Sequence, residues 1–244
     1  MSKMARYTLA SVVLFLLWQA GAMLLGPSVL PTPGAAFFVL GQEATTAAFW
    51  AHAGASTYRV LAALILGFGL AFPLGIFLGA ARRADAWLSP FVFLTYPIPK
   101  ILFLPVFLVL FGLGDAPKIL LIALTVGYQI LVVTRDNVRT LDRRYIDSFR
   151  SLSRDKLLLL RHVLVPAALP AALTSLRIAG GTAVAVLFLA ESFVTDAGLG
   201  YLIIDAWGRM DLPLMFAGII AMSLLGVLLY EGCNALEKIC CRWL

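Results

Sequence analysis

The side chains of this sequence that could do chemistry are concentrated in one charged interval, residues 135–170, between long apolar stretches. This interval holds eight of the nineteen Lys and Arg. So basic a loop between two apolar spans is expected to stay in the cytoplasm and to present itself to a partner. The eight residues are Arg135, Arg139, Arg143, Arg144, Arg150, Arg154, Lys156 and Arg161.

Two short helices are predicted within this interval, Tyr145–Leu152 and Arg154–Arg161, each of about two turns. The first is amphipathic, because it is polar on one side and carries apolar residues on the other. These apolar residues are Ile146, Phe149 and Leu152.

The patterns of common catalytic and metal sites are absent from the sequence. There is no GxxxxGK[ST], no HExxH and no GxSxG. The three cysteines, Cys233, Cys240 and Cys241, lie near the C-terminus, and the only histidines, His52 and His162, are expected at the surface. We therefore predict a chain that is not an enzyme, with no catalytic residue, no metal site and no cofactor of its own.

Composition indicates a polytopic membrane protein. Hydrophobic residues make up 61% of the 244 residues and charged residues only 13%, with a mean hydropathy of +0.95. The net charge of +6 comes mostly from residues at span ends and in the charged interval. Such a distribution argues against nucleic acid as a partner.

Six membrane-spanning helices are predicted, since each needs about 20 apolar residues. The distribution of Lys and Arg places both termini in the cytoplasm, and residues 1–244 form a single membrane domain with a cytoplasmic loop at about 135–170. The segment between the first two spans favours one or two interfacial helices. The spans are Tyr7–Gly26, Tyr58–Ala81, Leu88–Gly112, Pro117–Thr134, Leu173–Phe193 and Leu214–Tyr230.

Lys100 is the main candidate for a residue on a transport pathway, because it lies in the middle of the third span. An ammonium there costs a few kcal/mol unless it faces a wet cavity or a partner. It could favour an anionic solute, or it could cap carbonyls freed by nearby prolines. Those prolines are Pro97, Pro99 and Pro105.

Three further polar residues in the spans are pathway candidates: Tyr128, Gln129 and Glu191. For the first two, ordinary hydrogen bonds between helices are an equal alternative. Glu191 could gate the outer mouth, although we favour a solvated carboxylate at the interface. Arg177 and Arg59 are expected to extend to the cytoplasmic and outer headgroups respectively.

The spacing of the charged interval resembles the cytoplasmic "EAA" motif of permease subunits in ABC importers, E-A-A-x3-G-x9-I-x-L-P. Its positions fall here on Asp147, Ser148, Phe149, Ser153, Val163, Val165 and Pro166, and the proline is identical. Three more stretches resemble the nitrate/sulfonate/taurine branch of these permeases: Ser56–Ala80, Pro97–Lys118 and Ala190–Ile203.

This resemblance implies a type I importer in a bacterial inner (cytoplasmic) membrane. Two copies of the chain would pair with two ATPase subunits, which bind ATP and Mg, and with a periplasmic or lipid-anchored solute-binding protein. A coupling helix would dock on the ATPase, with Phe149 as its anchor. A basic loop lying on anionic membrane lipid is the alternative. The expected ATPase-coupling residues are Asp147, Ser148, Phe149, Arg150, Ser153 and Pro166.

The same resemblance implies transport of a small anionic solute such as a sulfonate, taurine or nitrate. Two alternatives remain open. One is import of a pyrimidine or flavin vitamin precursor by a similar permease. The other is a stand-alone secondary carrier, which usually needs more spans or inverted repeats.

Overall fold

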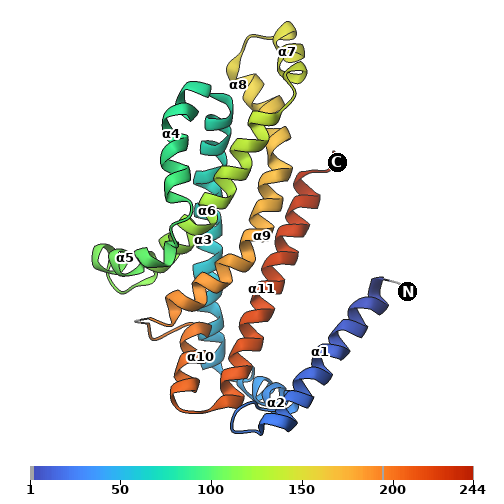
Figure 1. Ribbon diagram of the computed structural model, residues 1–244, viewed down its shortest axis with the longest axis vertical. Helices are drawn as coiled ribbons and strands as arrows, with labels where there is room; N and C mark the ends of the chain where they lie inside the picture. The colour runs from blue at the N-terminus through green and yellow to red at the C-terminus, as the bar shows by residue number, and fades with distance from the viewer. Residues whose placement is uncertain (1–2, 194, 244) are drawn as a thin grey trace. The chain divides into compact units, whose positions relative to one another are not determined.

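The computed structural model describes residues 3–193 and 195–243, and every regular element in these ranges is a helix (Figure 1). The predicted all-α class is therefore confirmed. In chain order the elements are α1 (Lys3–Leu25), α2 (Pro33–Glu43), α3 (Ala47–Ala80), α4 (Arg82–Thr95), the 3-10 helix η1 (Lys100–Phe103), α5 (Leu104–Phe111), α6 (Asp115–Thr140), α7 (Arg143–Leu152), α8 (Lys156–Leu159), the π-helix η2 (Leu160–Leu164), α9 (Val165–Glu191), α10 (Leu199–Gly208) and α11 (Leu212–Cys240).

Five helical stretches of the described chain are long and apolar enough to cross a membrane. They lie in α1, in α3, in α6, in the run from α8 to α9 and in α11. A sixth crossing arises if α4 and the segment made of η1 and α5 form one span, but these two parts meet at a bend of 89°. The predicted spans are thus present, and the third is broken. The cytoplasmic placement of both termini stays a prediction.

The predicted continuous third span, Leu88–Gly112, was wrong because α4 ends at Thr95 and η1 begins only at Lys100. Two prolines, Pro97 and Pro99, lie in the break. Each removes a backbone donor, and each disfavours helical geometry in the residue before it. Pro99 itself is extended, with ψ of 114°.

The predicted interfacial segment contains α2. Thr32 caps this helix by accepting a hydrogen bond from the N–H of Ala35 at 3.3 Å, and Pro33 occupies the first position, where its missing N–H costs nothing. The next helix, α3, begins at Ala47 rather than at the predicted Tyr58.

The chain divides into two compact units, residues 1–56 with 191–224 and residues 57–190 with 225–244. In the first unit, Trp18 of α1 contacts residues of α2, of α11 and of the turn before α2. Its indole N–H donates to the carbonyl of Pro31 at 3.0 Å, and its ring lies against the rings of Phe37 and Phe216.

In the second unit, α3 and α6 lie side by side because glycines of α3 face α6 (Figure 1). A Cβ at Gly67 would lie 2.9 Å from the Ala123 carbonyl oxygen, and a Cβ at Gly75 would lie 2.7 Å from the Cβ of Thr134. The small residues therefore permit a backbone contact that any side chain would prevent.

A buried charge cluster joins α4 to α6 in this unit. The carboxylate of Asp85 accepts hydrogen bonds from Arg135, with Nε–Oδ1 at 2.5 Å, and also from Arg139 and Ser89. Asp85 and Arg135 are both buried. Arg135 also contacts Asp136 at 2.5 Å, so each buried charge of the cluster has more than one partner.

Two arginines expected to extend to lipid headgroups instead form ion pairs. Arg59 is 4% exposed and its Nε lies 2.7 Å from Oδ1 of Asp115 on α6. Arg177 of α9 contacts Glu237 of α11 at 3.2 Å and donates to Asn234. Both expectations were wrong because each arginine has a carboxylate within reach on a neighbouring helix, which the sequence positions alone did not show.

We predict that Gly79→Ala lowers the free energy of unfolding by about 1–3 kcal/mol, the range for overpacking a tight contact. An added Cβ would lie 2.6 Å from the Cβ of Val138 and 2.7 Å from the carbonyl oxygen of Arg135. Gly69→Ala is the matched control on the same helix, because nothing lies within 4 Å of its Cβ position. Thermal unfolding in detergent compares the two, and equal midpoints would contradict the predicted contact.

Candidate functional site

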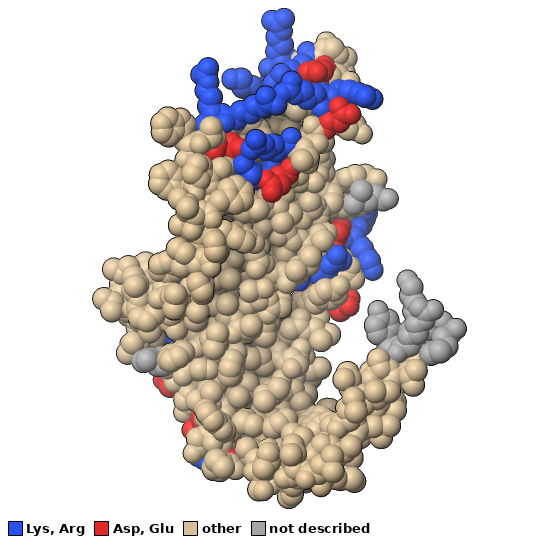
Figure 2. Space-filling view, in the orientation of Figure 1, with Lys and Arg blue, Asp and Glu red and all other residues tan. Residues whose placement is uncertain are grey.

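The segment expected to couple to a partner is folded as two capped helices at the basic end of the second unit. Figure 2 shows Lys and Arg gathered over α7 and α8. Asp142 caps α7 by accepting from the N–H of Arg144 at 2.9 Å, and Asp155 caps α8 by accepting from Leu157 at 2.8 Å. Between the helices, Ser153 is extended, with φ of −151°.

The two predicted helices of this interval are found with shifted bounds. The first starts two residues early, since α7 is Arg143–Leu152. The second starts at Lys156 and does not stop at Arg161, because the π-helix η2 carries α8 directly into α9. A π-helix often marks a functional position within a helix.

The apolar side of α7 is divided between the protein's own core and the surface. Ile146 packs against a buried cluster that includes Ile76, Val138 and Leu164. Leu152 is 87% exposed. The predicted apolar side is therefore only partly exposed, because Ile146 is held by the cluster beneath it.

The other expected coupling residues lie along the same segment. Asp147, Ser148 and Arg150 are exposed, whereas Phe149 is half-buried. Tyr145, which the sequence did not single out, is 64% exposed and adds a second aromatic ring to the surface of α7.

The remaining two coupling candidates lie at the ends of elements. Ser153 is half-buried, and its hydroxyl accepts from the N–H of Asp155 at 3.2 Å. Pro166 is the second residue of α9 and follows directly on the π-helix η2, within one continuous helical run. None of the six side chains is tied by an ion pair in the described ranges 3–193 and 195–243.

Lys100 lies at the break between α4 and α5, and its ammonium is turned toward the peptide backbone. It donates to three carbonyl oxygens, those of Thr95 at 2.6 Å, Tyr96 at 3.2 Å and Ile98 at 2.9 Å. The residue is 9% exposed. These contacts match the capping alternative, since an ammonium has three hydrogens and all three are donated. A role on the pathway stays a prediction.

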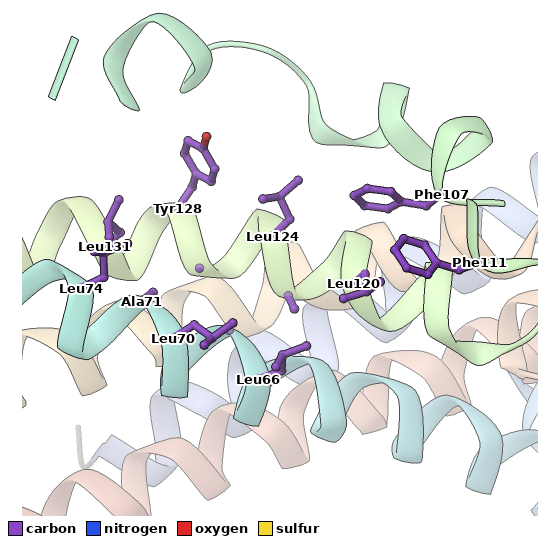
Figure 3. Close-up of a pocket in the computed structure, with 13 residues that line it drawn as sticks. Leu66, Leu70, Ala71, Leu74, Phe107, Phe111, Leu120, Leu124, Tyr128 and Leu131 are labelled. Carbon is purple, nitrogen blue, oxygen red and sulfur yellow. The ribbon is translucent and has the colours of Figure 1, made fainter. Parts of the chain in front are cut away.

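Tyr128 connects Lys100 to an apolar cavity of about 370 Å³ between α3, α5 and α6. The ammonium lies 4.3 Å from the centre of the Tyr128 ring, and the Tyr128 hydroxyl shares a hydrogen bond with the Thr95 hydroxyl at 2.9 Å. Figure 3 shows Phe107 and Phe111 on the α5 side of the cavity, opposite leucines of α3 and α6. Lys100 and Tyr128 are thus brought together, as neighbours around one bend.

Gln129 points to a different helix. Its amide donates to the hydroxyl of Thr182 on α9 at 3.5 Å, which is a long contact. This geometry is that of a hydrogen bond between helices, the alternative that the sequence left open.

Glu191 lies in the first unit and is 1% exposed, so the solvated carboxylate that we favoured was wrong. The hydroxyl of Ser56 donates to the Glu191 carboxylate at 2.8 and 2.9 Å, and the N–H of Gly200 donates to it at 2.9 Å. The N–H of Leu199 in turn donates to the Ser56 hydroxyl at 2.8 Å. A buried carboxylate with such partners fixes the chain that follows α9.

Sequence reasoning did not connect Gly198 or His52 with Glu191. Gly198 has φ of +130° and its Cβ position is filled by the Glu191 carboxylate, so only glycine fits. Its N–H donates to Nδ1 of His52 at 3.1 Å, and His52 stacks on Tyr201. A signal was present in the sequence, since Gly198 and Gly200 closely follow the acidic residue at the end of an apolar span.

No group of three His, Cys, Asp or Glu residues lies close enough to hold a metal ion in the part of the chain that the structure describes. What this arrangement offers is a membrane-spanning helix set with an exposed amphipathic helix attached.

The fold agrees with that of a known transporter. A solved structure titled "Inward facing conformations of the MetNI methionine ABC transporter" superposes with a TM-score of 0.65 and 18% identity. The match covers 77% of this chain and 94% of that one. At this identity the likeness establishes the fold of an ABC importer permease.

Curated relatives match over nearly the whole chain. SsuC of Bacillus subtilis (strain 168), a permease named for the transport of aliphatic sulfonates, is 30% identical over 96% of this chain and 86% of its own length. The taurine transport system permease protein TauC of Escherichia coli (strain K12) is 30% identical over 96% and 87%. The formylaminopyrimidine transport permease protein ThiX of Halalkalibacterium halodurans is 30% identical over 97% and 94%.

The family model for the binding-protein-dependent transport system inner membrane component matches residues 71–237, which include the last turns of α3, all of α4 to α10 and most of α11. The chain therefore belongs to the family of inner membrane components of binding-protein-dependent transport systems.

Proposed function

We propose that this chain is the membrane-spanning subunit of an ATP-driven importer for a small sulfonate, such as taurine or an alkanesulfonate. The observation that carries the proposal is the match, across 96% of the chain, to permeases named for aliphatic sulfonates and for taurine. The multi-pass helical fold and the exposed helix α7 support it.

The coupling mechanism follows from the position of α7. Its exposed side, with Tyr145 and Leu152, offers apolar surface to an ATPase subunit. Its inner side rests through Ile146 on a cluster containing Ile76 of α3 and Val138 of α6. Displacement of α7 by closure of the ATPases would therefore be passed directly to two membrane-spanning helices.

The assembly that we infer has two copies of this chain, two ATPase subunits that bind ATP and Mg, and an outer solute-binding protein. Hydrolysis takes place in the ATPases, and this chain only moves solute. A bacterial inner membrane is the expected location.

A second candidate substrate is a formylaminopyrimidine-type vitamin precursor. The relative ThiX, named for that transport, is 30% identical over 97% of the chain, and this observation keeps the alternative in view.

The proposed function predicts that taurine or an alkanesulfonate, delivered by its binding protein, stimulates ATP hydrolysis by the complete assembly in liposomes. Binding of the loaded solute-binding protein is expected to favour the closed arrangement of the ATPases. Nitrate, bicarbonate and formylaminopyrimidine are the comparison solutes. Stimulation of ATP hydrolysis by formylaminopyrimidine alone would identify the second candidate as the substrate.

We predict that Leu152→Glu lowers the amount of ATPase that copurifies with the permease by about tenfold, because a charge would replace an exposed apolar side chain that we expect the ATPase to cover. Leu157→Glu is the matched control, since Leu157 is also exposed, at 70%, but lies on α8. Asp147→Lys tests the register of docking in the same assay. Equal losses in Leu152→Glu and Leu157→Glu would show that α7 is not the specific docking element.

We predict that Lys100→Met lowers the free energy of unfolding of the permease by about 1.5–3 kcal/mol, the range for hydrogen bonds to a charged group, because three carbonyls lose one charged donor together. Lys100→Arg is expected to recover much of this loss, since a guanidinium also donates several hydrogen bonds. Unfolding in detergent and transport in liposomes are measured on both variants. Full stability of Lys100→Met with loss of transport would instead support direct contact with the anionic solute.

A further inference from the structure

An apolar cavity of about 460 Å³ lies under α7 and α8 in the second unit, within the size range of ligand pockets. One wall is the last turns of α3, and the other wall comes from η2 and the start of α9. The apolar side chains that matter here are Phe72, Ile76, Phe77 and Ala80 of α3 with Leu160 and Leu164 of η2.

A second cavity, of about 420 Å³, adjoins the first and is polar. The two cavities share Arg150, Lys156 and Leu159 in their linings. The polar cavity adds Arg154 and the Ser153 side chain. An apolar pocket and a basic pocket thus have a common border.

The charges around this border are predominantly positive. Three basic side chains, Arg150, Arg154 and Lys156, stand against one carboxylate, that of Asp155. The carboxylate is already engaged, because it accepts from the backbone N–H of Leu157 at 2.8 Å. Within the described residues, none of the three basic side chains forms an ion pair.

The position of the cavities relative to the membrane follows from α3. This helix is apolar enough to span a bilayer, and its last turns form the wall of the apolar cavity. The loop next to it is the most basic part of the chain (Figure 2), and from the positive-inside rule we infer that this end lies at the cytoplasmic headgroups. Anionic lipids of the cytoplasmic leaflet attract Lys and Arg at this level.

We propose that this pair of cavities binds one anionic phospholipid, with an acyl chain in the apolar cavity and the headgroup phosphate between Arg150 and Lys156. The geometry requires an amphiphile, because the apolar wall is continuous with the basic border. A free anion would occupy only the polar cavity and would leave the apolar one unused. The lipid would join α3 to α8 beneath the coupling helix α7, and the proposal does not depend on which solute is transported.

The test is native mass spectrometry of the purified full-length permease, titrated with phosphatidylglycerol or with phosphatidylethanolamine. We expect selective retention of phosphatidylglycerol. Lys156→Glu should weaken its binding by about tenfold or more, since each basic side chain at the headgroup level contributes to the attraction. Ala80→Trp should also reduce binding, because the indole would fill the apolar cavity.

The matched control is Arg161→Glu, which reverses a charge in the same loop but at a residue that lines neither cavity. It should change the affinity by no more than about twofold, an effect within the range of a screened surface charge. Lys156 is exposed, so its substitution leaves the core intact. Circular dichroism checks that Lys156→Glu, Ala80→Trp and Arg161→Glu are all folded.

Four results would overturn the proposal. Equal retention of phosphatidylethanolamine would show that the lipid charge plays no role. An equal loss of phosphatidylglycerol binding in Arg161→Glu and Lys156→Glu would show that only the general positive charge of the loop attracts the lipid. Displacement of the lipid by glycerol phosphate would indicate an anion site alone. Loss of the lipid on assembly with the ATPase would assign the cavities to that partner.

Discussion

The close contact of α3 with α6 is the interaction on which the second unit depends. Gly67, Gly75 and Gly79 leave no side chain between the two backbones, and in a bilayer such packing stabilises helix pairs where the hydrophobic effect does not. Several neighbouring features of this unit contact the helix pair. Its residues line the apolar cavity beside Tyr128, and Ile76 belongs to the cluster on which α7 rests. A change in the α3–α6 distance would therefore affect the apolar cavity and α7 together.

The sequence predicted the elements better than their partners. Apolar length was sufficient to find the spans, and the amphipathic pattern was sufficient to find α7, because both depend on residues close together in the chain. The prolines at the third span were noticed, but whether they would kink a helix or end it depends on the neighbours that satisfy the freed carbonyls. Arg59 and Arg177 were placed by their distance from the span ends. Their carboxylate partners lie 56 and 60 positions away along the chain, and no local pattern predicts such pairings.

The same difference between local and long-range information applies to the candidate site. The pattern of charged and apolar residues in the interval 135–170 predicted the short helix α7, yet the sequence could not show which side of α7 faces inward. Ile146 and Leu152 are equally apolar by type, and only the position of the core beneath the helix distinguishes them. Glu191 was misjudged for a related reason. Its burial requires Ser56 from the start of α3 and the glycine backbone after α9 to meet it, and those segments are far apart in sequence.

The contacts of Lys100 bear on how a membrane path could select an anion. With its three hydrogens donated to carbonyls, the ammonium has none left for another acceptor. Its charge is not cancelled by these neutral partners, however, and it stands beside the Tyr128 ring that lines an otherwise apolar cavity. In a medium of low dielectric constant a fixed charge acts over a longer range than in water. Lys100 can thus be structurally engaged and still keep an uncompensated positive charge beside the cavity, so its structural contacts do not decide against the predicted role on the pathway.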